Sequence, residues 1–171
     1  MEFEFLVQPA MTTASSELDE VRSLARDLHR AMDTVAMATA LAEIPPIGGT
    51  SHAVDAIVTP IASHYGFLSQ RADLFSGYPT RLRPDWYRPL GGSGILLEIE
   101  RGKTITNNMD LLDLWKCHIC READHLFLVV PLRVTRTTGS ENVYSRVVAR
   151  MKTFVMPENQ VNVASIAVFG Y

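Results

Sequence analysis

Residues 83–100 read RPDWYRPLGGSGILLEIE. Two runs of strand-forming composition, Leu82 to Tyr87 and Gly94 to Glu100, lie on either side of a turn rich in glycine and proline. A third such run, Phe67 to Phe75, comes just before them and ends at the turn signal SGYP, residues 76–79. Three neighbouring strands separated by turns predict a meander.

Helices are predicted on both sides of this meander. Upstream, apolar side chains recur at helical spacing from Ser16 to about Ala42 and again from Ala53 to Ala62, and the Pro-Pro and Gly-Gly pairs within residues 44–49 end the first helix. Downstream, the segments Met109 to Cys120 and Glu141 to Phe154 show the same spacing. The meander therefore lies between two pairs of helices along the chain.

Three further strands complete the pattern. Leu126 to Val130 is a continuous apolar run ended by Pro131, as expected of a strand that is buried on both faces. Val161 to Phe169 has the composition of a final strand, and residues 2–7 alternate acidic and apolar side chains, which suits a short edge strand. This order of elements predicts an α/β fold with a mixed central sheet flanked by helices.

The length and composition are those of an ordinary globular protein. The 171 residues fit a single domain, with residues 1–50 as an N-terminal helical extension and residues 52–171 as the core. The N-terminus has neither the basic flank nor the apolar stretch of a signal peptide, and no run reaches the ~20 apolar residues of a membrane span. The chain has only two cysteines, Cys117 and Cys120. We therefore expect a cytoplasmic protein with no membrane partner.

The net charge of −3 is unevenly distributed along the chain. Residues 1–70 carry three basic side chains against nine acidic ones, or −6, whereas residues 71–152 carry thirteen basic against nine acidic ones, or +4. A basic segment in an otherwise acidic chain favours the middle of the sequence as a surface for binding nucleic acid.

Three acidic residues occur where two predicted strands meet. Glu98 and Glu100 lie two positions apart at the end of an apolar run, so their side chains point to the same face of the strand, and Asp85 lies on the strand before it. Adjacent carboxylates repel each other unless a cation relieves them, and Mg²⁺ prefers such ligands. On a solvated strand face, the same acids would simply pair with neighbouring basic side chains.

The pair Pro84-Asp85, followed thirteen positions after Asp85 by Glu98-Ile99-Glu100, resembles the signature of the PD-(D/E)xK nuclease superfamily. The resemblance covers about residues 52–131, and it includes the order helix, three-stranded meander, helix and strand. It implies a restriction-endonuclease-like core in which Asp85, Glu98 and the backbone carbonyl of Ile99 bind Mg²⁺, which Mn²⁺ can replace. Glu100 would hold a second ion or orient the attacking water.

The reaction that this resemblance implies is metal-dependent hydrolysis of a phosphodiester, with DNA favoured over RNA as the substrate. Many members of the superfamily act as homodimers, so a homodimer is expected as well. Contacts to phosphates would come from four arginines near the acids, which are otherwise ordinary surface charges: Arg81, Arg83, Arg88 and Arg101.

Glu100 departs from the motif, because the superfamily most often has lysine at that position. Some of its restriction enzymes carry a second glutamate there, and the cation must then come from elsewhere in the chain. Lys103, just past the strand, and Lys116, on the following helix, are the candidate catalytic cations. Lys116 could equally form a simple pair with Asp113, three residues before it.

Other functions remain compatible with these residues. A nuclease fold that no longer cuts, kept as a module that binds nucleic acid or protein, is suggested by Glu100, although the retained acids argue for activity. A glycosidase is disfavoured because Glu98 and Glu100 project from one strand edge. The sequence CHIC at residues 117–120, with His125 nearby, suggests zinc, but a single cysteine pair within a helix falls short of a four-ligand structural site.

Overall fold

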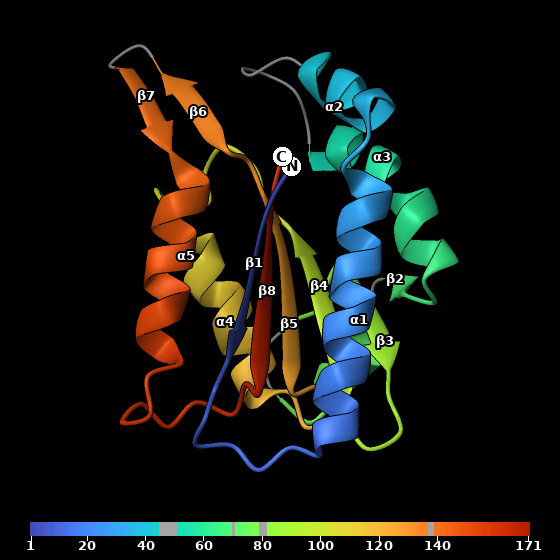
Figure 1. Ribbon diagram of the computed structural model, residues 1–171, viewed down its shortest axis with the longest axis vertical. Coiled ribbons are helices and arrows are strands. Elements are labelled where there is room, and N and C mark those ends of the chain that lie inside the picture. The colour runs from blue at the N-terminus through green and yellow to red at the C-terminus, as the bar shows by residue number, and fades with distance from the viewer. Residues whose placement is uncertain (45–50, 70, 79–81, 137–138) are drawn as a thin grey trace.

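The computed structural model describes residues 1–44, 51–69, 71–78, 82–136 and 139–171. Its centre is a six-stranded sheet in the order β1-β8-β5-β4-β3-β2 (Figure 1). Three strands run parallel to one another: β4 (Gly94–Ile99), β5 (His125–Val130) and β8 (Ser165–Gly170). The others pair antiparallel: β1 (Glu2–Val7), β2 (Leu68–Ser69) and β3 (Trp86–Pro89). The predicted α/β class with a mixed sheet is confirmed.

Helices cover both faces of the sheet (Figure 1). The helices α4 (Met109–Ile119) and α5 (Val143–Phe154) pack on one face, and α1 (Ser15–Met32), α2 (Val35–Ala42) and α3 (Ser51–His64) contribute to the core on the other. Side chains of strand β5 enter the cores on both faces of the sheet, because successive strand side chains point to opposite faces. As predicted from its unbroken apolar run, β5 is buried along its whole length.

The N-terminal segment belongs to this same core. The strand β1 pairs with β8 over six residues, and α1 buries Val21, Leu24 and Leu28 against the sheet. The single long helix expected from Ser16 to Ala42 is instead two helices, because the hydroxyl of Thr34 accepts a hydrogen bond from the Met37 amide at 3.2 Å and starts α2. The expected linker at residues 45–49 lies outside the described residues.

The meander is present but shorter than predicted. Its first strand, β2, has two residues. The end of the predicted run forms a 3₁₀ turn, Ala72–Phe75, whose Leu74 and Phe75 side chains are buried in the core beneath α4 and α5. The strand β3 begins at Trp86, so Asp85 directly precedes the strand on which it was predicted. The Asp85 amide donates to the Glu98 side chain, which ends the backbone ladder at this point.

A second, two-stranded sheet was missed by the sequence analysis. The strands β6 (Arg133–Arg136) and β7 (Gly139–Asn142) form a hairpin between β5 and α5. The helix α5 accordingly starts two residues later than predicted, at a cap where the Asn142 side chain accepts from the Ser145 amide at 3.1 Å. The final strand also starts later, at Ser165 instead of Val161.

The connection from β4 through α4 to the parallel strand β5 positions the candidate site. This connection packs α4 on the same sheet face as α5, and side chains of β4 point to this face. None of the helices within the described ranges is long and apolar enough to cross a membrane.

Candidate active site

The predicted acids lie together at the carboxyl end of β4. The Asp85 amide donates a hydrogen bond to Glu98 Oε2 at 3.2 Å, and the Ile99 amide donates to Asp85 Oδ2 at 2.9 Å. These two bonds hold Asp85 beside the end of β4. Glu98 points toward α4 and is only 2% exposed.

Helix α4 adds an acid and a lysine to this group. The Lys116 ammonium lies 2.7 Å from Glu98 Oε1 and 2.8 Å from Asp113 Oδ1. Both Asp113 and Lys116 are buried, and the negative charge of Asp113 acts on the Glu100 carboxyl group. Asp85, Glu98, Glu100, Asp113 and Lys116 thus lie together at the end of β4, and we call these five residues the carboxylate cluster.

The charges in the cluster are unbalanced. Burial, with the negative charges of Asp113 and Asp85, raises the pKa of Glu100 to about 8, and burial raises the pKa of Asp113 to about 6. Burial and the charge of Asp113 also hold the pKa of Glu98 well above its usual range. Burial works against the charge of Lys116, but the Glu98 and Asp113 carboxylates raise its pKa above the usual range. Lys116 is thus charged at neutral pH, while Glu100 retains a proton.

The cluster has a buried floor and a more open rim. Glu98, Asp113 and Lys116 are buried, whereas Asp85 and Glu100 are half-buried and face solvent in part. A phosphate or a hydrated ion would therefore meet Asp85 and Glu100 first.

The other predicted basic residues are spread around the molecule. Lys103 is exposed in the turn after β4, and the lysine that contacts the carboxylates is Lys116. Arg88 lies on the opposite face of the sheet, where its guanidinium donates to the Tyr65 carbonyl at 2.9 Å and lies 3.7 Å from Glu20. Arg83 is exposed beside Asp85, and Arg81 lies outside the described residues. Arg101 lines a cavity at the end of the sheet.

The cluster has the donor chemistry of a Mg²⁺ site, although it does not gather three acidic side chains around one point within the described residues. Its carboxylate oxygens are the ligands that hard divalent cations prefer. In the ranges that the structure describes, however, no three His, Cys, Asp or Glu side chains converge closely enough to hold a metal ion. The Lys116 ammonium lies between Glu98 and Asp113 instead.

The residues near the CHIC sequence have other partners. The Cys117 thiol donates weakly to the Ala123 carbonyl at 3.8 Å, and His118 Nδ1 accepts from the Asn162 amide at 2.9 Å. His125 Nδ1 lies 2.8 Å from the Ser165 hydroxyl, and its Nε2 lies 3.0 Å from Glu17 Oε1. The contacts run from a serine through a histidine to an acid, as in a hydrolase triad. Ser165 and His125 are fully buried, however, so no substrate reaches the hydroxyl. These three residues tie α1 to the amino ends of β5 and β8.

Asp113 is the site residue that the sequence analysis did not assign. The three-residue spacing predicts a pair between Asp113 and Lys116 on the helix, without a partner on the sheet. The available signal was the spacing of Asp110, Asp113 and Lys116, which places polar side chains on the buried face of an amphipathic helix. Buried charges need partners, so such a face points to charged groups on the sheet.

Comparisons with known proteins add no family to this description. No family model matches the sequence, and no curated protein matches it.

Proposed function

We propose that this protein is a Mg²⁺-dependent nuclease with a restriction-endonuclease-like core, and that it hydrolyses phosphodiester bonds of nucleic acid, with DNA favoured over RNA. The observation that carries the proposal is the meeting of Asp85, Glu98 and Glu100 with Asp113 and Lys116 at the end of β4. The chain order α3, β2-β3-β4, α4, β5 supports it, because the resembled superfamily has the same order of helix, meander, helix and parallel strand.

Each residue has a role in this proposal. Asp85, Glu98 and the Ile99 carbonyl would hold Mg²⁺, and Mn²⁺ would serve in its place. The ion supplies an activated water and offsets negative charge on the scissile phosphate. Glu100 orients the attacking water, and Lys116 provides the cation that the motif usually places at position 100. Asp113 orients Lys116, and the exposed Arg83 contacts a neighbouring phosphate.

The charge imbalance of the cluster is consistent with a bound cation. A divalent ion at the rim would replace the proton that Glu100 retains, so binding should release protons and strengthen as pH rises. We predict that Mg²⁺ raises the melting temperature of the protein more at pH 8 than at pH 5. Differential scanning calorimetry with Mg²⁺ or with EDTA measures this, and Asp85→Asn and Glu98→Gln should remove the shift.

Cleavage tests the reaction itself. Purified protein is incubated with plasmid, linear duplex, single-stranded DNA and RNA, with Mg²⁺, Mn²⁺ or EDTA. We expect metal-dependent cleavage that falls to background in Asp85→Asn, Glu98→Gln and Lys116→Met and persists in Lys103→Met and in the exposed control Glu158→Gln. Circular dichroism establishes that each variant is folded. Equal cleavage by the Lys103 and Lys116 variants would reject the role of Lys116.

A second candidate is a nuclease fold that no longer cuts and instead binds nucleic acid or a protein. The ion pairs of Lys116 with Glu98 and Asp113 favour it, because buried carboxylates that are already paired with an ammonium group have less need of a metal ion. Binding of a labelled duplex without cleavage, together with no Mg²⁺ effect on melting, would select this candidate.

A further inference from the structure

A cavity lies where the parallel strands end, apart from the side chains of the carboxylate cluster. It has a volume of about 390 Å³, and its walls include the residues that follow β4, β5 and β8, namely Arg101, Pro131 and Tyr171. The ends of α1 and β1, the helices α2 and α3, and the β6-β7 hairpin complete these walls. Ligands of open α/β sheets bind at the carboxyl ends of the parallel strands. The volume also lies within the range of about 300–1,000 Å³ typical of small-molecule sites.

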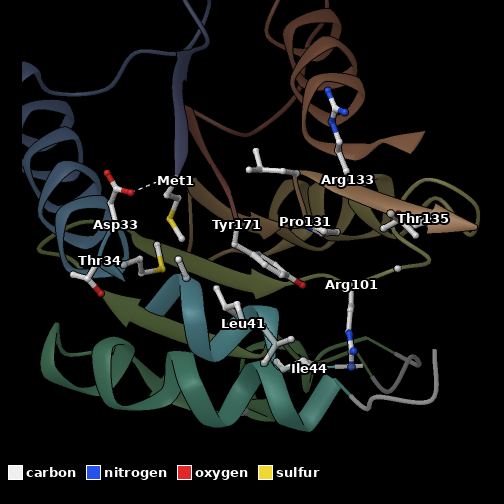
Figure 2. Close-up of a pocket in the computed structure, with 16 residues that line it drawn as sticks. Met1, Asp33, Thr34, Leu41, Ile44, Arg101, Pro131, Arg133, Thr135 and Tyr171 are labelled. Carbon is white, nitrogen blue, oxygen red and sulfur yellow. Dashed lines mark hydrogen bonds and ion pairs between the residues drawn. The ribbon is translucent and has the colours of Figure 1, made fainter. Parts of the chain in front are cut away.

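The walls of this cavity are mainly apolar and include groups that suit an aromatic ring. Figure 2 shows the ring of Tyr171 projecting into the space above Leu41 and Ile44. The side chains of Met1 and Met32 line the cavity as well. Aromatic rings and methionine thioethers both make favourable contacts with another aromatic ring. The walls therefore favour the ring of an aromatic molecule over a bare inorganic ion.

Two charged side chains of the wall have their charge satisfied without a ligand. The Asp33 carboxylate lies 2.5 Å from the amino group of Met1, and a dashed line joins the two in Figure 2. Arg133 is exposed and points away from the other labelled side chains (Figure 2). Asp33 is thus neutralised by its partner, and the charge of Arg133 lies in solvent.

The charges near Tyr171 oppose one another. Burial raises the pKa of the Tyr171 hydroxyl, and the positive charge of Arg101 lowers it. The carboxyl groups of Glu100 and Asp55 act on the same hydroxyl and raise its pKa. A charged ligand would therefore lose its hydration in the cavity without meeting an unbalanced opposite charge, which is unfavourable. An uncharged ligand does not have this cost.

We propose that this cavity binds an uncharged aromatic molecule, whose ring packs against Tyr171, Leu41 and Ile44. The proposal is independent of the nuclease reaction. The Tyr171 hydroxyl donates to the Glu100 carbonyl at 3.0 Å, so its ring is held in place as a wall of the site before a ligand arrives. A wall that is already ordered loses little conformational entropy on binding.

Two aromatic dyes of nearly the same shape test the preference for an uncharged ligand. N-phenylnaphthylamine is uncharged, and anilinonaphthalene sulfonate is its anionic counterpart. Fluorescence titration of the full chain should show one site for the neutral dye, with an affinity about tenfold or more above that for the sulfonate. No binding of the neutral dye, or an affinity for the sulfonate equal to or above that for the neutral dye, would overturn the proposal.

Variants of Tyr171 test whether the ligand meets its ring. Tyr171→Leu removes the ring and should lower the affinity for the neutral dye about threefold to tenfold. Tyr171→Phe keeps the ring without the hydroxyl and should bind the dye as the wild type does. Circular dichroism establishes that both variants are folded. Equal affinities of the two variants would show that the dye does not pack on the ring.

A second pair of variants tests the location of the site. Ala38 is exposed on α2 and lines the cavity, so Ala38→Trp should fill it without disturbing the core and should abolish binding of the neutral dye. Ala36→Trp, an exposed change on the same helix outside the cavity lining, is the matched control and should bind the dye as the wild type does. Undiminished binding in Ala38→Trp would place the dye elsewhere and overturn the proposal. Nuclease activity has no bearing on any of these outcomes.

Discussion

Glu100 shows how a single residue couples this fold to pH. Its pKa is about 8 instead of 4.5, so the folded state keeps a proton that the unfolded state loses. The free energy of unfolding contributed by this group is therefore intact below about pH 4.5 and decreases as pH rises toward 8. This carboxyl group thus reduces the stability of the protein at neutral pH.

We predict that Glu100→Gln stabilises the metal-free protein at pH 8 by roughly 1–3 kcal/mol and changes its stability little at pH 4. The amide stays uncharged at both pH values. Urea unfolding in EDTA at the two pH values measures the difference. Glu158→Gln, on an exposed loop, is the control, and an equal shift of Glu100→Gln at both pH values would contradict the explanation.

At the scale of elements, the network of Glu17, His125 and Ser165 joins one helix to two strands. Glu17 also accepts a hydrogen bond from the Ser93 hydroxyl at 2.6 Å, so the network includes the β3-β4 turn. Burial lowers the pKa of His125 below its usual 6.5, so the folded state holds the ring neutral. A base with a lowered folded pKa costs stability when the unfolded state takes up a proton, that is, as pH falls below about 6.5.

We therefore predict that His125→Gln loses less stability than the wild type between pH 7 and pH 5, although it is less stable at pH 7. The glutamine cannot take up a proton, while the wild-type ring must do so on unfolding. Thermal melts across this range provide the comparison, with the exposed His64→Gln as control. Parallel curves for the wild type and His125→Gln would show that His125 does not set this dependence.

At the scale of the whole molecule, the first strand connects layers that are far apart in the chain. The Phe3 ring stacks on His29 of α1 at 5.1 Å and packs on Phe169 of β8 at 5.3 Å (ring centroids). In Figure 1, β1 and β8 lie side by side at the centre, and both chain ends lie at the same end of the sheet. The N-terminal segment should therefore unfold together with the rest.

Phe3→Ala should lower the free energy of unfolding by about 1–3 kcal/mol while keeping one transition, because the lost contacts belong to the common core. The neighbouring Glu4→Ala removes only an exposed pair with Lys152 and should cost at most about 1 kcal/mol. Near- and far-ultraviolet circular dichroism in urea measures both variants. An unchanged main transition in Phe3→Ala would mean that the segment is an appendage.

Several features could be predicted from the sequence because their signals are local. The unbroken apolar run at Leu126 to Val130 predicted a strand buried on both faces, and helical spacing predicted α4 and α5 within two residues at each end. The alternation of strand side chains placed Glu98 and Glu100 on one face. Competition between neighbouring local structures was harder to predict. The Thr34 cap divides the first helix, and Glu141 belongs to strand β7 instead of helix α5.

Only the tertiary structure decided which groups meet. The spacing of residues 109–119 does not predict that Asp113 and Lys116 face Glu98. This contact depends on the orientation in which α4 packs on the sheet between β4 and β5. The same holds for the cavity, whose walls come from segments throughout the chain. Secondary structure follows from periodicities over a few residues, whereas a site is built from contacts between elements that burial brings together across the whole sequence.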